Sequence, residues 1–308
     1  MEHWKLFPAP PKSKEKIVVD GRNVTRFYNN DASLITNQDD NPKLKKSKRN
    51  SYILYLAPAK YGKLKEKDGT LVNTCPNASP ECIATCLNTA GNPAFKEKIP
   101  SRIDKTAFYV NFKEIFLMKL AREIWYAAFR HTGYEVAIRV NGTSDLPIVD
   151  EMMNRGYLDK IPKNVVFYDY TKNPMGAGVF KLKSGHYYVV TFSRSETNTL
   201  IAQQLLKKGC NVAIPFRGKK LPKKWKGFDV IDADMADDIM IDLAYGEYRE
   251  RDPETKKYTG KVYKKGPSRE GYVFGLRAKG SLRSFQSKKY GKAGFVIDCD
   301  SLDNCTVG

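Results

Sequence analysis

The sequence predicts an α/β protein built on a mainly parallel sheet, either covered by helices on both faces or curved into a barrel. Short, continuous apolar runs recur along the chain, as in strands that are buried on both faces. Helical segments separate several of these runs, which is the pattern of strand–helix–strand units. The chain has 308 residues, of which 41% are hydrophobic, so it is long enough to bury a sizeable core.

The individual elements are predicted from apolar spacing and from residues that start or stop helices. The clearest helix is expected over about 112–131, where apolar side chains recur at helical spacing and Gly133 supplies a stop. Two shorter helices are expected over 145–157 and 198–208, each after a capping residue. The interval 171–186 is too rich in Gly and Pro for a helix. The predicted strands are 52–57, 136–140, 165–168, 187–192, 212–214 and 228–231.

The chain is expected to divide into a lead-in and one folded domain. Residues 1–50 carry several Pro, Asn and Asp residues and end in a basic run, which predicts an irregular, basic lead-in. Residues 51–308 are predicted to form a single α/β metal-binding domain. Within it, residues 245–272 interleave Tyr with Lys, which predicts a basic, hairpin-like insertion.

The charge balance favours a polyanionic partner. The 53 Lys and Arg residues outnumber the 34 Asp and Glu residues, which gives a formal net charge of +19. Contact with nucleic acid or a nucleotide is therefore predicted, because cations that neutralise phosphates release condensed counterions. The alternative is a solvated basic surface. The residues expected to contact nucleic acid are Lys45, Lys46, Lys48, Arg49, Lys256, Lys257, Lys264 and Lys265.

Several classes of protein are disfavoured. The chain has no run of eighteen apolar residues, and its first residues lack the apolar stretch of a signal peptide. We therefore expect a cytoplasmic protein without a membrane partner. Only His3, His131 and His186 are present, which argues against histidine-based triads and metalloproteases. No dinucleotide-binding or P-loop glycine motif occurs.

Three cysteines stand close together in one polar loop. Cys75, Cys82 and Cys86 have the spacing C-x6-C-x3-C, with Pro, Asn and Gly residues around them. Thiolates are soft ligands that select zinc or an iron–sulfur cluster over hard cations. A structural zinc site needs a fourth protein ligand, which the loop lacks. The remaining cysteines that could supply it are Cys210, Cys299 and Cys305.

These cysteines leave three hypotheses. A [4Fe–4S] cluster held by three cysteines leaves one iron open for a small ligand, an arrangement that suits catalysis, and we favour it. Zinc closed by a distant cysteine and three unligated thiols are the alternatives. Cys299 and Cys305 are expected to be ordinary thiols.

Polar clusters follow the predicted strands at the point where each strand ends. In parallel α/β folds these carboxyl ends meet at one edge of the sheet, where chemistry gathers. The sequence therefore predicts one polar pocket for a cofactor or substrate. Its expected residues are Asn141, Ser144, Asp145, Asp169, Ser193, Arg194 and Glu196.

Several motifs resemble a phage and plasmid family named after a mycobacteriophage gene eighty-eight product. The resemblance covers most of residues 51–298 and implies a phage or mobile-element origin, and hence the host cytoplasm as the location. It implies no particular activity. The motifs that carry it are TCPNASPECIATCLNTAG, RVNGTSDLP, FYDYTKN, TFSRSETN and GLRAKG.

A looser similarity is to radical S-adenosylmethionine enzymes, in which three cysteines follow the first strand of a partial (β/α)6 barrel. Here too the cysteine loop follows an early strand and precedes a long helix and alternating strands. This similarity implies a barrel-like parallel sheet, a [4Fe–4S] cluster and S-adenosylmethionine on the open iron. The usual spacing in that superfamily is C-x3-C-x2-C, which is shorter than the spacing found here, and its glycine-rich motif in the second strand is absent.

Two functions from different classes follow. The favoured one is an iron–sulfur, radical S-adenosylmethionine-like phage enzyme that acts on nucleic acid or a nucleotide. The alternative is a non-catalytic nucleic-acid-binding protein with a structural zinc or iron–sulfur site.

Overall fold

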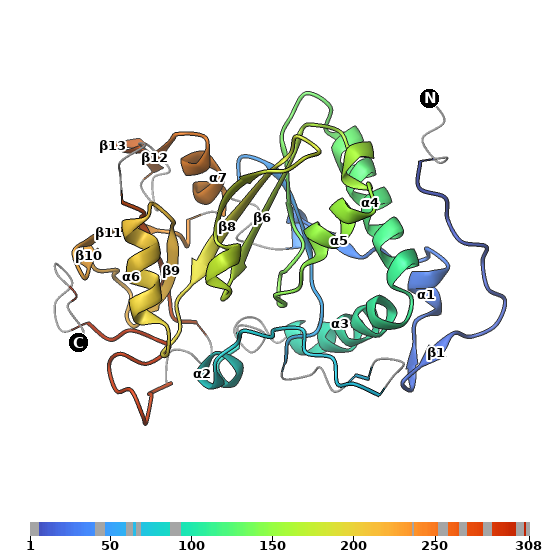
Figure 1. Ribbon diagram of the computed structural model, residues 1–308, viewed down its shortest axis with the longest axis horizontal. Helices are drawn as coiled ribbons and strands as arrows, with labels where there is room; N and C mark the ends of the chain where they lie inside the picture. Colours follow the sequence, from blue (N-terminus) through green and yellow to red (C-terminus); the bar gives the residue numbers. More distant parts are fainter. Residues whose placement is uncertain are drawn as a thin grey trace.

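The computed structural model describes residues 6–40, 47–59, 64–65, 69–86, 94–235, 237–251, 258–264, 270–279, 285–299 and 305. Its centre is one mixed, mainly parallel sheet of ten strands (Figure 1). The strand order is β10-β11-β14-β9-β8-β6-β5-β4-β3, and β7 pairs with β8 outside this path. The parallel strands are β4 (Asn50–Leu54), β5 (Val136–Arg139), β6 (Val165–Thr171), β8 (Tyr187–Ser193), β9 (Val212–Phe216), β14 (Val273–Arg277) and β11 (Phe228–Asp232).

Antiparallel strands lie at both edges of the sheet. They are β3 (Ile35–Asn37) beside β4 and β10 (Lys224–Trp225) beside β11, while β7 (Gly178–Lys181) runs antiparallel to β8. The predicted α/β class with a mainly parallel sheet is thus confirmed. In the described part of the chain the sheet stays open, and no closed barrel is formed.

Helices cover one face of the sheet. The strand register places Phe167, Phe192 and Val212 on this face, because residues paired across parallel strands point to the same side. Their apolar side chains pack among the buried residues of the helices. These helices are α3 (Ala94–Asn111), α4 (Lys113–Arg130), α5 (Ile148–Asn154) and α6 (Thr199–Lys207).

The opposite face is covered by one helix and one hairpin. Tyr168 and Ala213 point to this side and share a buried apolar cluster with residues of α7 (Asp238–Ala244). The antiparallel hairpin of β12 (Glu247–Arg251) and β13 (Tyr258–Lys264) adds Tyr248 and Tyr263 to the same cluster. The hairpin predicted within 245–272 is therefore present. Both faces of the sheet are buried, which explains why its strands are continuous apolar runs.

The lead-in before β4 contains short elements that pack on the main core. Phe7, Val24, Phe27 and Leu34 are buried in the apolar cluster that also holds α3 and α4. The remaining elements of the chain are β1 (Val18–Val19), β2 (Arg22–Asn23), α1 (Thr25–Tyr28), α2 (Pro80–Ala84), and the 3-10 turns η2 (Gln38–Asp40), η6 (Leu158–Lys160) and η7 (Pro174–Gly176).

The predicted helices have different outcomes. The helix expected over 112–131 is α4, and the helix expected over 198–208 is α6. The one expected over 145–157 is shorter, because Pro147 caps α5 and the helix ends at Asn154. Helix α3 was not predicted, since Pro100 and many charged residues obscure its apolar spacing. No helix in the described ranges is long and apolar enough to span a bilayer.

One glycine, Gly271, packs against the end of α6 and the turn that follows it, where a larger residue would clash. A Cβ atom added to Gly271 would lie 2.0 Å from the carbonyl oxygen of Cys210, a backbone atom that cannot swing away. The Gly271 N–H also donates to the carbonyl oxygen of Leu206 at 2.7 Å, which fixes the approach. The strand β14 begins two residues later, so this contact sets its entry into the sheet.

We therefore expect Gly271→Ala to lower the free energy of unfolding by about 1–3 kcal/mol, the usual cost of overpacking a tight site. The matched control is Gly176→Ala, because an added Cβ there would meet no atom closer than 3.9 Å. Urea unfolding followed by circular dichroism measures both. If the two variants are equally stable, the close approach of Gly271 to the Cys210 carbonyl is contradicted.

Candidate functional site

The three clustered cysteines line a single pocket of about 150 Å³. The pocket lies at the carboxyl ends of β5, β6 and β8, which contribute Arg139, Tyr170 and Ser193. This is the edge of a parallel sheet at which ligands of α/β proteins usually bind. The remaining lining residues are Cys75, Ala78, Cys82, Thr85, Cys86, Asn141, Gly142, Thr143, Ser144, Asp145, Thr171, Lys172 and Phe295.

Local hydrogen bonds shape the cysteine segment. The Cys75 N–H donates to Asn73 Oδ1 at 3.0 Å, which makes a turn before the first thiol. Ser79 caps α2, and its Oγ accepts from the Cys82 N–H at 3.3 Å. Pro80 occupies the first turn, where its missing N–H costs nothing. The sequence thus specifies one short helical turn that carries Cys82.

Buried Glu196 anchors this turn to the sheet. Its carboxylate accepts from Ser79 Oγ at 2.7 Å and from the Glu81 N–H at 3.1 Å. A carboxylate at a helix N-terminus also meets the positive end of the peptide dipoles. In turn, Glu81 Oε2 accepts from the Phe295 N–H at 2.8 Å. The cysteine helix is therefore bonded both to the strand ends and to the segment that carries Phe295.

Asn141 organises the loop after β5. Its Oδ1 accepts from Ser144 Oγ at 2.8 Å and from the Leu146 N–H at 3.0 Å. The next residue, Gly142, packs so closely on Tyr55 that an added Cβ would lie 2.5 Å from the ring. The Asp145 N–H donates to the Thr74 carbonyl at 2.7 Å, which ties this loop to the cysteine segment.

Asp169 is buried behind this loop and is absent from the pocket lining. It accepts from the Asn141 N–H at 2.9 Å and from Tyr188 Oη at 3.2 Å. Burial raises the pKa of Asp169 to about 7, although Arg139 lies 3.8 Å away and opposes the shift. Its contacts make it a support for Asn141 and Arg139, at the back of the pocket wall.

Burial also governs the ionisation of the thiols. It raises the pKa of Cys75 to about 11 and raises the pKa of Cys82. The charges of neighbouring thiolates add to both shifts, because like charges disfavour one another. Burial thus favours the neutral thiol over the thiolate at both positions. A metal that binds here must displace protons, as metals bound by thiolates do.

Lys172 and Arg139 are cations that line this pocket, and Lys172 is the one that interacts with Cys82. Its Nζ donates to Ser193 Oγ at 2.9 Å and lies 5.0 Å from the centroid of the Phe295 ring. Burial lowers the pKa of Lys172, while the charge of Cys82 and a hydrogen bond to it act in the opposite direction. In return, the charge of Lys172 and its hydrogen bond offset part of the rise that burial causes in the pKa of Cys82. Lys172 therefore offers positive charge where the thiolates would be.

The structure divides the residues predicted for the pocket. Asn141, Ser144, Asp145 and Ser193 line it together with the three cysteines. Arg194 and Glu196 do not, and each serves as an anchor. Arg194 is fully buried and donates to Thr199 Oγ1 at 3.0 Å, to the carbonyl of Ala293 at 2.5 Å and to that of Gly294.

Lys172, Arg139 and Phe295 were not among the predicted pocket residues. Lys172 directly follows β6, so the rule that selected the other strand-end residues also applied to it. Arg139 is the last residue of β5 and lies 4.8 Å from the Tyr170 ring centroid. Phe295 carries no such signal, because it comes from a distant segment without regular structure.

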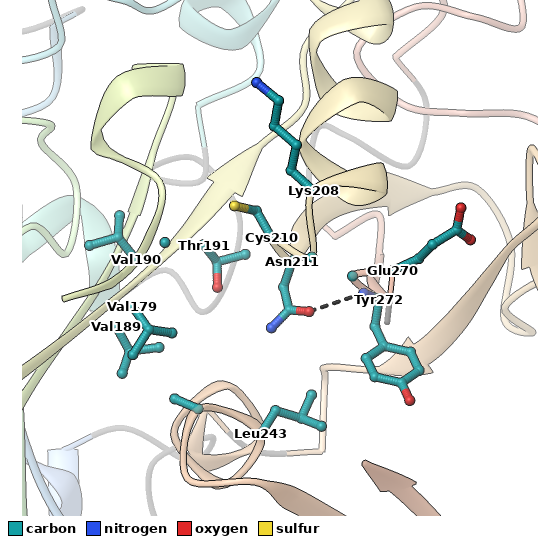
Figure 2. Close-up of a pocket in the computed structure, with 14 residues that line it drawn as sticks. Val179, Val189, Val190, Thr191, Lys208, Cys210, Asn211, Leu243, Glu270 and Tyr272 are labelled. Carbon is teal, nitrogen blue, oxygen red and sulfur yellow. Dashed lines mark hydrogen bonds between the residues drawn. The ribbon is translucent and has the colours of Figure 1, made fainter. Parts of the chain in front are cut away.

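The other cysteines lie away from the three-cysteine pocket. Cys299 and Cys305 form a disulfide, so the prediction that they are ordinary thiols was wrong. Cys210 lines a different pocket, of about 290 Å³, where β8 and β9 diverge (Figure 2). In Figure 2 it stands beside Asn211, whose Oδ1 accepts from the Tyr272 N–H at 3.0 Å. Within the described ranges, no three His, Cys, Asp or Glu side chains are arranged to hold a metal ion.

Of the eight cationic residues predicted to contact nucleic acid, the structure describes three: Lys48, Arg49 and Lys264. Lys48 Nζ lies 3.3 Å from Asp242, and the same carboxylate accepts from Arg49 at 2.8 Å. Arg49 also pairs with Glu135, so both cations hold elements of the protein together. Lys264 is exposed on β13. The others lie outside the described residues: Lys45, Lys46, Lys256, Lys257 and Lys265.

We expect Lys172→Met to raise the pKa of Cys82 further, because the ammonium group that favours the thiolate is lost. In metal-free protein near pH 8, alkylation of Cys82 should slow on the order of tenfold per unit of pKa. Iodoacetamide labelling with mass spectrometry measures this rate. The control is Lys163→Met, whose amine donates to the Ser184 carbonyl and does not line the pocket. An unchanged or faster reaction in Lys172→Met alone would contradict the assigned contact.

Comparison with known proteins gives a family and no activity. No curated protein matches the chain, and no solved structure matches it. The family described as Gene product 88 matches residues 28–271, which include the cysteine segment and the carboxyl ends of β5, β6 and β8. This span is most of the 308 residues, and the chain therefore belongs to the Gene product 88 family.

Proposed function

We propose that the cysteine pocket holds a [4Fe–4S] cluster and that the protein is a radical S-adenosylmethionine-like enzyme acting on nucleic acid or a nucleotide. The observation that carries this proposal is the convergence of Cys75, Cys82 and Cys86 on one pocket at the carboxyl edge of the sheet. When bound, such a cluster with one open iron would supply electrons to a small ligand at that iron.

The donor set fits this cluster better than it fits zinc. A structural zinc ion takes four protein ligands. None of the distant cysteines that could complete a zinc site lies at the pocket, since Cys210 lines another cavity and Cys299 is joined to Cys305. A four-iron cluster is larger than one ion and spaces its ligands more widely. Three thiols around a shared cavity suit such a cluster more than they suit a single ion.

The residues around the thiols have separate tasks in this proposal. Lys172 would offset the negative charge that three thiolates bring into a buried site. The apolar ring of Phe295 would exclude water on the same side. Ser144, Asp145 and Ser193 would bind the polar groups of a small cofactor such as S-adenosylmethionine. Arg139 would remain with its partners Asp169 and Asp237 and hold the back of the pocket.

The arrangement of the strands supports a likeness to a partial (β/α)6 barrel. Five parallel strands, β4, β5, β6, β8 and β9, follow one another across the sheet in chain order, and the helices α3 to α6 lie on one face. A singly wound sheet of this kind is the open form of a (β/α) barrel. The cysteine segment follows β4, the first of these strands, as in the enzymes that the sequence resembles.

For the metal, we expect protein purified without oxygen to be brown and to contain iron and acid-labile sulfide. Cys82→Ser should lose most of both, because it removes one of three ligands. Cys210→Ser is the matched control, since its thiol lies in another pocket, and it should keep both. A colourless protein that contains one zinc ion and no iron would overturn the enzyme and favour a nucleic-acid-binding protein with a structural zinc.

For the reaction, we expect the reduced, iron-loaded protein to cleave S-adenosylmethionine, as followed by chromatography of the adenosyl product. Cys82→Ser should abolish cleavage and Cys210→Ser should retain it. If the reduced, iron-loaded protein leaves S-adenosylmethionine intact, the proposed use of this cofactor is contradicted. Only the part of the proposal that concerns the cluster then remains.

A further inference from the structure

A strongly basic groove lies apart from the cysteine pocket. It measures about 560 Å³ and runs between the segment 219–224 with β11 on one side and β13 on the other. Among the described residues, six cationic and two acidic side chains line it, which is a formal excess of four positive charges in this part of the chain. The cations are Lys219, Lys220, Lys223, Lys224, Lys261 and Arg277, and the acids are Asp229 and Asp232.

Both carboxylates of the groove already have cationic partners. Asp232 accepts two hydrogen bonds from Arg277, each of 2.8 Å, and this bidentate pairing is strong. Asp229 lies 3.6 Å from Lys224. Lys219 and Lys220 are exposed in the segment after β9. The charges of Lys219 and Lys220 therefore remain open to solvent at the groove.

The groove shares an edge of the sheet with the cysteine pocket. Asp232 ends β11 and Arg277 ends β14, and the segment with Lys219 and Lys220 follows β9. These strands are parallel to β8, which ends at the cysteine pocket, and β9 is the direct neighbour of β8. A chain-like ligand bound in the groove would thus lie on the side of the sheet where the pocket opens.

We infer that this groove binds the sugar–phosphate backbone of a nucleic acid. An extended polyanion can contact several lysines at once and release counterions at each contact, which a small anion cannot do. The one aromatic residue of the lining, Tyr263, is only 4% exposed and offers no face for a base to stack on. The groove therefore contacts phosphates without reading bases. The inference takes only the class of partner from the proposed function and does not depend on the metal.

The test compares two matched charge reversals. The groove variant is Lys219→Glu with Lys220→Glu, and the control is Lys14→Glu with Lys16→Glu. All four lysines are exposed, and both variants change the net charge equally. The control pair precedes β1, which lies at the opposite end of the molecule from β10 and β11 (Figure 1).

Binding is measured by fluorescence anisotropy on the full-length protein with DNA and RNA of mixed sequence, single- and double-stranded, across a salt series. We expect the groove variant to bind at least ~10-fold more weakly and its salt slope to fall by about two, one for each lysine. The affinity of the control variant for nucleic acid should stay within about twofold of the affinity of the parent protein. Changing the base sequence should have little effect on any of the three proteins.

Three results would overturn the groove as a backbone site. One is unchanged binding in the groove variant, and another is an equal loss in both variants, which would indicate net charge alone. The third is competition by polyglutamate as effective as competition by nucleic acid, which would indicate an acidic protein partner. Lys219→Gln with Lys220→Gln repeats the test with a milder change if the reversed pair unfolds.

The metal content of the same samples separates this inference from the proposed function. The groove variant should keep the iron content of the parent protein. Weaker nucleic-acid binding with unchanged iron content therefore supports the groove inference independently of the proposed cluster. A zinc protein without iron would overturn the enzyme, and the comparison of binding would remain valid.

Discussion

Two carboxylates hold the candidate site together. Glu196 and Glu81 connect three segments that are far apart in the chain: the cysteine helix, the end of β8 and the segment that carries Phe295. Glu196 is buried, and a buried carboxylate is stable only when it is hydrogen-bonded, so its contacts constrain one another. Arg194 supports the same region by donating to the carbonyls of Ala293 and Gly294. Together these bonds fix the helix that carries Cys82 relative to the other walls of the cavity.

The cost of burying a charge also explains how the ionisable groups of the pocket are arranged. Burial is the largest cause of the raised pKa values of Cys75 and Cys82, and Lys172 is a cation that opposes the rise at Cys82. Behind them, Asp169 and Arg139 form a second buried pair in which burial and attraction act against each other. The protein thus places its ionisable groups in two layers. Arg139 lines the cavity as well, and Asp169 lies behind it and fixes the loop after β5.

The sequence predicted elements with continuous apolar character and missed those without it. The predicted strands β4, β5, β6, β8, β9 and β11 and the helix α4 are apolar runs, so their positions follow from burial, whereas β3, β7, β10 and β14 were not predicted. Helix α3 was missed because Pro100 and its charged residues hide an apolar face that is buried by tertiary contacts. The position of β14 between β9 and β11 could not be predicted either, since it depends on a crossover between strands that are distant in the chain.

The candidate site was predictable only in part, for a related reason. The cysteines and the polar residues after β5 and β8 are close in sequence to the strands that place them, so the pattern identifies them. Arg194 and Glu196 were selected by the same rule, yet their side chains hydrogen-bond to neighbouring segments and do not line the pocket. The basic groove combines loop residues with Lys261 of a hairpin. Its charge is visible in the sequence, whereas its shape arises from contacts between segments.

The divergence of β8 and β9 has a mechanical consequence. These two strands pair at only two positions, Phe192 with Val212 and Ser193 with Ala213. On one side of this narrow seam lie the strands that form the cysteine pocket, and on the other lie those that border the basic groove. A small rotation about the seam would change the spacing between pocket and groove while each half kept its own hydrogen bonds. Within the sheet, the two candidate sites are thus connected through these two paired positions.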